Sequence, residues 1–430
     1  MMYRKNIQSN FLTQIFHIVT GFVTSVLIAR ALGPEGKGYL VFLTLIFNLI
    51  AQYSHFGVLN ATTYYQKRSQ YSVSEIFNTN MTYVFFLLVL ITAGVFGGKY
   101  SGLIFAGYDF LLLILGLIFV LATLLFIIIR MTFIGREEIH EVNKMEFLSK
   151  GIYTLLIVLF FATHRLTVLV CFALFAGMAV LKCLSSYAKL GIAYHFSFDK
   201  FLIRQEYHFG KYIFFAALFG YLVYRADQVL IKGMLGDGEL GIYSVAVVLA
   251  ELIFLIPVSV TSALSGRLYN LKPAEEKNEF QIVARTFRFT FYVCVGLALI
   301  GVALSPLVPH VYGIEYARSA SLVRILFAGV VFASLGKVTY PYFLTKGRPQ
   351  IHLLTTLGTL IVNIVLNLLL IPKYKITGAA YATLISYFLY GLSYIIFLNR
   401  RENVPLSSLF VLTKEDRQMI KTLWQKQRNN

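Results

Sequence analysis

Long apolar runs, separated by short polar or basic segments, fill almost the whole chain. Because about 20 apolar residues cross the hydrocarbon core of a bilayer as a helix, and lipid offers the backbone no hydrogen-bond partners, each run predicts a transmembrane helix. The expected fold is an all-α polytopic membrane protein with about twelve transmembrane helices. The predicted spans are 10–32, 38–60, 81–98, 110–130, 147–164, 166–187, 212–233, 240–264, 287–308, 321–344, 351–371 and 378–398.

The composition supports this interpretation. Of the 430 residues, 58% are hydrophobic and 13% are charged, whereas about 25% of a soluble domain is charged. Twelve spans leave room only for short loops, which excludes a large soluble catalytic domain. The three cysteines, Cys171, Cys183 and Cys294, fall in or beside apolar runs, so we expect neither a disulfide framework nor a zinc site. We therefore expect no cofactor and no bound metal.

The formal net charge of +18 is spread thinly between the spans, and no basic module for binding nucleic acid is visible. In a membrane protein such an excess usually records topology. With the N-terminus inside, the cytoplasmic segments hold 26 basic residues and the opposite side holds 8. This ratio predicts that both termini are cytoplasmic. The first span has no convincing cleavage site and is predicted to be retained.

An internal repeat follows the first and the seventh span. The segment 32–39 reads Leu-Gly-Pro-Glu-Gly-Lys-Gly-Tyr, and the segment 235–242 reads Leu-Gly-Asp-Gly-Glu-Leu-Gly-Ile, with an offset of 203 residues. Six spans separate the copies, so both keep the same orientation, which predicts a parallel repeat. Asp237 and Glu239 are therefore interpreted as turn residues rather than as a catalytic pair.

The repeat predicts two six-helix lobes and a tail. The N-terminal lobe is expected at 1–205, the C-terminal lobe at 206–398 and a cytoplasmic tail at 399–430. In transporters built from repeats, substrate sites lie near the midplane, where the halves meet.

Two segments have the pattern of membrane-surface structure. Residues 195–211 mix phenylalanines with basic side chains, as an interfacial connector does. In the tail, Thr413 and Asp416 resemble a helix capping box with Asp in place of Glu. An apolar stripe follows them at Met419, Ile420, Leu423 and Trp424. A solvated tail is the alternative.

Five ionisable side chains stand out within the predicted spans: His17, Arg225, Asp227, Glu251 and Lys337. A charge at the membrane centre costs at least about 2.5–3.5 kcal/mol, so such groups normally face the protein interior or water. One interpretation is a hydrated cavity in which bases bind an anion and acids couple transport to an ion. The other is that these charges pair and lock helices together.

Uncharged polar residues indicate a wet interior less specifically. Asn48 and Gln52 mark the second span, and Asn363 and Asn367 lie four residues apart on the eleventh. One polar face at that spacing can line a cavity, although hydrogen bonding between helices is the commoner use.

Four segments resemble Wzx-type oligosaccharide flippases, which belong to the multidrug/oligosaccharidyl-lipid/polysaccharide exporter superfamily. They are Asn367-Leu-Leu-Leu-Ile-Pro-Lys-Tyr-Lys-Ile-Thr-Gly-Ala-Ala-Tyr-Ala-Thr383, Ala29 to Tyr39, Tyr224 to Leu230, and Gly241 to Pro257. The resemblance extends from about residue 5 to residue 400, and four motifs in order make it specific. Lys375 departs from the pattern, because the family more often has Gly there.

The resemblance implies an inner-membrane flippase rather than an enzyme. It implies that undecaprenyl-pyrophosphate-linked oligosaccharide moves from the cytoplasmic to the outer leaflet by alternating access, for O-antigen, capsule or exopolysaccharide synthesis. Membrane lipid, a polysaccharide polymerase and a chain-length regulator are the other partners implied, and no nucleic acid. On this basis Arg225, Lys337 and His17 are expected to contact the pyrophosphate. Asp227 and Glu251 are the candidates for H⁺ or Na⁺ coupling.

Two other functions stay open at this point. An ion-coupled multidrug or cation antiporter of the same superfamily needs a cavity dominated by acids, whereas bases here at least equal acids. A membrane polysaccharide polymerase or glycosyltransferase typically needs a sizeable outer loop, and the longest predicted outer connections have about a dozen residues.

Overall fold

The computed structural model describes residues 2–68, 70–102, 104–271, 279–402, 405–414, 416 and 418. These residues include ten continuous helices that are long and apolar enough to cross a membrane. Two of them, α1 (Met2–Tyr53) and α13 (Pro349–Glu402), have 52 and 54 residues. At about 1.5 Å per residue, each is far longer than one crossing of about 30 Å requires.

Both long helices fold back at a residue that is not helical. In α1 the break is at Gly33, and the Lys37 ammonium donates to the Ser25 carbonyl oxygen at 3.0 Å. A straight helix would separate those positions by about 18 Å. In α13 the break is at Lys375, and a Cβ built on Gly378 would lie 2.3 Å from the Leu370 carbonyl oxygen. Each long helix thus holds two spans, and the prediction of about twelve spans is confirmed.

The remaining elements lie in the expected order. They are α2 (Thr62–Arg68), α3 (Val73–Tyr100), α4 (Phe110–Gly135), α5 (Ile139–Ala162), α6 (Val168–Leu190), α7 (Lys200–Leu235), α8 (Asp237–Glu251), α9 (Leu255–Tyr269), α10 (Glu279–Leu304), α11 (Val308–Tyr312), α12 (Ala317–Thr345) and α14 (Leu406–Phe410), with short 3₁₀ helices η1 (Val58–Asn60), η2 (Leu252–Phe254), η4 (Ser305–Leu307) and η5 (Ile314–Tyr316).

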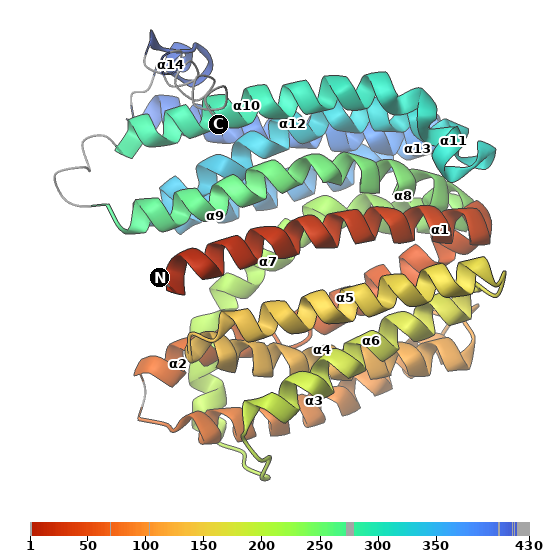
Figure 1. Ribbon diagram of the computed structural model, residues 1–430, viewed down its shortest axis with the longest axis vertical. Helices are drawn as coiled ribbons and strands as arrows, with labels where there is room; N and C mark the ends of the chain where they lie inside the picture. The colour runs from red at the N-terminus through yellow and green to blue at the C-terminus, as the bar shows by residue number, and fades with distance from the viewer. Residues whose placement is uncertain are drawn as a thin grey trace, which may run out of the picture. The chain divides into compact units, whose positions relative to one another are not determined.

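The chain divides into two compact units, which are described separately. Unit 1 contains Met1–Ser244 and His310–Tyr316, and unit 2 contains Val245–Pro309 and Ala317–Asn430. In unit 1, α1 lies along α5, and α4 packs against both α6 and α1 (Figure 1). In unit 2, α12 is the central helix and packs against α13, α10 and α9. The middle of α4 in unit 1 and the middle of α12 in unit 2 are largely buried, as the core of a helical bundle requires.

The two repeated turns have the same backbone geometry. Gly33 (φ 64°, ψ −178°) and Gly236 (φ 90°, ψ −174°) both adopt a conformation that side chains disfavour. A Cβ on Gly38 would lie 1.8 Å from the Asp237 carbonyl oxygen, and one on Gly241 would lie 1.9 Å from the Pro34 carbonyl oxygen. The turns therefore pack backbone to backbone, and the glycines make this contact possible.

Several span boundaries differ from the prediction because polar side chains begin or end helices. The second span ends at Tyr53 rather than at residue 60. Directly after Tyr53 the chain turns, because the Gly57 N–H donates to His55 Nδ1 at 3.1 Å and Gly57 has φ 88°. The third begins at Val73 rather than residue 81, because Ser72 and Glu75 form a capping box.

The predicted surface connector divides into two parts. Residues 191–199 are irregular, and α7 then begins at Lys200. Asp199 caps its first turn, because the Phe201 N–H donates to Asp199 Oδ1 at 2.7 Å. The phenylalanine at 201 is exposed. The first turns of α7 therefore belong to a long helix rather than to a separate surface segment.

The capping box predicted in the tail is confirmed. The Thr413 N–H donates to Asp416 Oδ2 at 3.0 Å, and the Asp416 N–H donates to Thr413 Oγ1 at 3.2 Å. Asp416 also pairs with Arg288 at 2.6 Å and with Arg285 at 2.9 Å, which attaches the tail to α10. Burial alone would raise the pKa of Asp416, but hydrogen bonds from Thr413 and Arg288 outweigh it and hold the pKa below its usual value. The predicted stripe at 419–424 lies outside the described residues.

Candidate functional site

A basic cavity lies inside unit 1, between α1, α4, α5 and α6. Its volume is about 220 Å³. Five of its lining residues are polar and five are apolar or aromatic. They are His17, Glu146, Ser149, Lys150 and Lys182, and Phe119, Tyr153, Phe175, Met178 and Ala179. We call this the His17 cavity.

The two lysines of the His17 cavity come from the middle of their helices. Lys150 is the twelfth of the 24 residues of α5, and Lys182 is the fifteenth of the 23 residues of α6. Among the described residues neither ammonium forms an ion pair. Aromatic rings offset part of the cost of burial, because the Lys182 Nζ lies 4.1 Å from the centroid of Phe126 and the Lys150 Nζ lies 5.3 Å from that of Tyr153.

The cavity has an excess of positive charge and an unused hydrogen-bonding atom. Two lysines face one glutamate, Glu146, which is also within electrostatic reach of His17. The Nε2 atom of His17 is buried and has no hydrogen-bond partner among the described residues. Buried polar atoms are nearly always partnered, so an orphan that lines a cavity marks a place for a ligand or water. An anion with several acceptor oxygens, such as a phosphate or diphosphate, matches this set of donors.

The sequence pattern identifies His17 but not its neighbours. Lys182 falls within the predicted span 166–187 but is not among the five ionisable side chains that stand out there, although it lies inside α6 and lines the cavity. Lys150 falls within the predicted span 147–164 and is likewise not among those five side chains. The spacing of Glu146, Lys150 and Tyr153 at i, i+4 and i+7 places them on one helix face, and this is the signal that the sequence offers.

Arg225 and Asp227 lie on α7 in unit 1. The Asp227 side chain is 3% exposed, and its Oδ2 accepts from the Tyr243 hydroxyl of α8 at 2.5 Å. Its Oδ1 accepts from the Gln228 N–H at 2.8 Å. Asp227 therefore joins α7 to α8. Arg225 is half-buried, and its Nη1 donates to the Tyr224 carbonyl oxygen at 3.4 Å.

Lys337 and Glu251 belong to unit 2. The Lys337 Nζ lies 4.6 Å from the centroid of Phe254, in the 3₁₀ turn η2 that directly follows Glu251. Also in unit 2, His352 was not predicted; it stacks on Tyr340 and its Nδ1 lies 2.6 Å from a tyrosine hydroxyl on the same long helix. Lys337 thus lies beside the aromatic ring of Phe254.

The four predicted cavity-lining residues have different surroundings. Asn48 donates to the Thr44 carbonyl oxygen at 2.7 Å, and Gln52 is exposed. Asn363 and Asn367 are fully buried in unit 2, and the Asn367 amide donates to the Asn363 carbonyl oxygen at 2.8 Å. Asn363 Nδ2 and Asn367 Oδ1 have no partner among the described residues, so this pair faces the interior of unit 2 with unused polar atoms.

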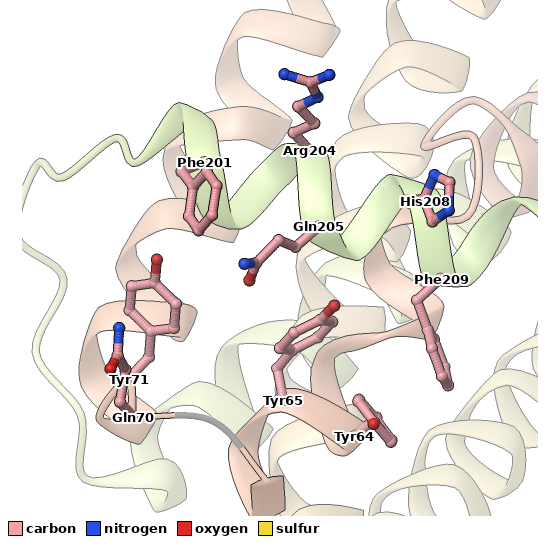
Figure 2. Close-up of a pocket in the computed structure, with 9 residues that line it drawn as sticks. All are labelled: Tyr64, Tyr65, Gln70, Tyr71, Phe201, Arg204, Gln205, His208 and Phe209. Carbon is pink, nitrogen blue, oxygen red and sulfur yellow. The ribbon is translucent and has the colours of Figure 1, made fainter.

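A second cavity of unit 1 has a different chemistry. It is about 630 Å³ in volume and lies between α2, residues 70–71 and the first turns of α7. Five of its nine lining residues are aromatic: Tyr64, Tyr65, Tyr71, Phe201 and Phe209, with Gln70, Arg204, Gln205 and His208. Figure 2 shows Arg204 pointing away from the tyrosines. With a single permanent cation directed outward, this cavity fits an anion less well than the His17 cavity.

Known structures share this fold. A lipid II flippase MurJ in an inward closed conformation matches with a TM-score of 0.74 and 15% sequence identity over 93% of this chain and 88% of that chain. An inward-facing multidrug resistance MATE family transporter of the MOP superfamily matches with a TM-score of 0.69 and 14% identity, over 91% and 94% of the two chains. The chain therefore shares the fold of these two proteins.

Sequence comparisons identify the family. The family model described as polysaccharide biosynthesis protein matches residues 3–266, and the MatE model matches residues 213–369. The capsular polysaccharide biosynthesis protein CapF of Staphylococcus aureus is 24% identical over 62% of this chain and 70% of its own length. A putative O-antigen transporter of Shigella flexneri is 22% identical over 43% and 44% of the two chains. The chain belongs to the polysaccharide biosynthesis protein family, as the resemblance in the sequence predicted.

Proposed function

We propose that this protein is a flippase that carries a lipid-linked oligosaccharide across the membrane for surface polysaccharide synthesis. The His17 cavity binds the diphosphate that joins the sugar to its polyprenyl carrier, undecaprenyl in the bacterial case. The observation that carries this proposal is the position of Lys150 and Lys182 in the middle of membrane-spanning helices, where neither forms an ion pair with a described residue.

The physical problem of flipping lies in the headgroup. A sugar diphosphate loses its hydration if it enters about 30 Å of hydrocarbon, and an unpaired charge there is very costly. Lysines inside the protein replace part of that hydration by charge-assisted hydrogen bonds, while the polyprenyl tail stays in lipid. His17 Nε2 supplies one further polar contact.

The other predicted residues take supporting roles in this proposal. Arg225 and Lys337 are further cationic contacts for the headgroup, and Asp227 and Glu251 are acids available for coupling to H⁺ or Na⁺. We place both termini in the cytoplasm on the distribution of basic residues, with the two repeat-related lobes alternating their access. A polymerase and a chain-length regulator would act on the delivered product.

The alternative functions of the same fold are less well supported. A drug or organic-cation antiporter needs a cavity in which acids outnumber bases, and the His17 cavity has the reverse balance. The relatives named above carry names of biosynthesis proteins and transporters, and the structural neighbours are a flippase and multidrug transporters. These comparisons favour a transporter over a polymerase or glycosyltransferase.

The test is production of surface polysaccharide in the native host with the chromosomal gene replaced by variants. Lys150→Gln combined with Lys182→Gln should reduce surface polysaccharide at least tenfold, with unchanged amounts of protein in the membrane. Lys189→Gln is the matched control, because Lys189 is 40% exposed and pairs with Glu141 at 2.7 Å. Full polysaccharide output from the double variant would contradict the proposal. A variant with Arg at both positions should keep most of the activity, since the charge is retained.

A further inference from the structure

Glu206 is an acid on the buried face of α7, outside the sites described above. Leu202, Glu206, Gly210 and Phe214 follow one another at intervals of four residues, and all four are buried. Residues at this spacing share one face of a helix. At Gly210 the backbones are in contact, because a Cβ there would lie 1.9 Å from the Gly57 carbonyl oxygen. Glu206 is therefore pressed against the rest of unit 1 rather than placed on its surface.

Among the described residues Glu206 has one hydrogen-bond partner, and that partner is neutral. The Asn80 amide of α3 donates both to Glu206 Oε1 and to Thr62 Oγ1 of α2, each at 3.1 Å. The second oxygen, Glu206 Oε2, is buried and has no partner among the described residues, and the same holds for Asn80 Oδ1. Two acceptor oxygens without donors in one buried cluster indicate that a hydrogen is missing from it.

No cation faces Glu206 from the elements packed around it in the described part of the chain. The titratable groups within electrostatic reach of Glu206 are Tyr65 of α2 and Tyr83 of α3, and Tyr53 of α1 and His55 lie on the adjoining segments. The described charged side chains of α2 and α3 are engaged or distant, because Lys67 pairs with Glu137 at 2.9 Å, Glu75 caps the start of α3 and Lys99 lies in its last turn. Burial lowers the pKa of His55 to about 4, so its imidazole is neutral near pH 7.

The basic residues of α7 itself lie on another face of the helix. Arg204 and His208 are each two positions from Glu206, about 200° around the helix, and both are exposed and line the second cavity (Figure 2). An ionised Glu206 would thus be a buried charge without a counter-ion, which is strongly destabilising. A proton on Oε2 removes that charge.

We propose that Glu206 is a proton-binding site that makes H⁺ the coupling ion of transport. The carboxyl group holds a proton on Oε2 while α7 packs on α2 and α3 as described. When this packing opens, the O–H bond breaks, the proton leaves to water as hydronium and the electron pair stays on the carboxylate. Its role in transport rests on the proposed flippase function.

The proposal follows from linkage between proton binding and packing. If one state binds a proton that the other releases, the proton stabilises the first state and its loss favours the second. Glu206 is near one end of α7, and Arg225 and Asp227 are about 30 Å further along the same helix. A change in how the Glu206 end of α7 packs is thereby transmitted along a rigid element to the other end.

Infrared spectroscopy of the purified full-length protein tests the proton directly. A protonated carboxyl group has its own carbonyl stretch, distinct from that of a carboxylate. This band should be present in wild type at about pH 7, lost in Glu206→Gln and retained in the control Glu137→Gln, whose side chain is 75% exposed. An unchanged band in Glu206→Gln would overturn the proposal.

Stability and transport measurements distinguish H⁺ from Na⁺ at Glu206. The apparent melting temperature of wild type should fall by several degrees between about pH 6 and about pH 9, because deprotonation leaves a buried charge, whereas that of Glu206→Gln should stay flat. If Na⁺ raises the melting temperature of wild type but not of Glu206→Gln, the site binds sodium and the proposal is wrong. In vesicles, a pH gradient should accelerate flipping by wild type and not by Glu206→Gln, and acceleration of both would also refute it. If wild type flips no lipid-linked oligosaccharide, the proposed function fails, while the infrared result still decides the proton site.

Discussion

The packing of the two repeated turns makes Gly241→Ala a sharp perturbation. The new Cβ would lie 1.9 Å from the Pro34 carbonyl oxygen, and ordinary contacts of this kind begin at 3.4 Å. The backbones of α1 and α8 would therefore have to separate by about 1.5 Å at this point. Overpacking a tight contact typically costs about 1–3 kcal/mol. Because the obstacle is backbone and cannot rotate away, we expect the upper end of this range.

Gly233→Ala is the matched control on the preceding helix. Nothing lies within 4 Å of the Cβ that it would introduce. In an open helical position Ala is favoured over Gly by about 0.5–1 kcal/mol, so the two substitutions should have effects of opposite sign.

The assay uses the cysteines of the protein. Cys171, Cys183 and Cys294 are all buried, so a thiol-reactive fluorophore reports unfolding of the detergent-purified protein. At about 2 °C per kcal/mol, Gly241→Ala should melt about 6 °C below wild type, and Gly233→Ala should melt at or slightly above it. If Gly241→Ala has the same melting temperature as wild type, the two turns do not pack backbone to backbone as described.

Four further outcomes follow from the local geometry of the break at Lys375 and of the Asp416 ion pairs. Lys375 has φ 54° and ψ −138°, a backbone conformation that costs a residue with a side chain about 1–3 kcal/mol. Lys375→Gly should therefore raise the melting temperature by a few degrees. A melting temperature below that of wild type would mean that the lysine side chain stabilises the turn. Asp416→Asn should lower the free energy of unfolding by about 3 kcal/mol at neutral pH, because the buried Arg288, 5% exposed, loses its counter-ion. Arg285→Gln should lower it by less than about 1 kcal/mol, because Arg285 is 40% exposed. The folded pKa of Asp416 is below its usual value of about 3.9, so the stabilisation by its ion pairs is complete above that pH and is lost only as the pH falls through the folded pKa. The difference in unfolding free energy between wild type and Asp416→Asn should therefore be constant from about pH 5 to about pH 8. A difference that disappears by about pH 6 would contradict this assignment.

The sequence predicted the spans well because the membrane imposes one rule on every residue at its depth. Helix ends were less accurate, since they depend on individual side chains. The imidazole of His55 closes a turn that ends the second span early, and the capping box at Ser72 starts the third span early. Lys375 departs from the glycine that the resemblance leads one to expect at this position, and the positive φ in the break of α13 is the physical reason why glycine suits it.

The candidate site was only partly predictable. His17 is recognisable because an ionisable group in an apolar run is conspicuous. Its meeting with Lys150 and Lys182 depends on the packing of α1 against α5 and α6, which lie more than 80 residues further along the chain. Glu206 falls in the predicted surface connector, although its spacing of four from Leu202 and Gly210 indicates a buried face.

Direct binding of the lipid diphosphate tests whether the His17 cavity is the headgroup site. Undecaprenyl pyrophosphate, undecaprenyl phosphate and undecaprenol would be titrated against purified wild type and the variant carrying Lys150→Gln and Lys182→Gln. Wild type should bind the diphosphate at least tenfold more tightly than the alcohol, and the double variant should lose most of that difference, because two charge-assisted contacts are removed. Equal preference for the diphosphate in both proteins would show that the His17 cavity is not where the headgroup binds.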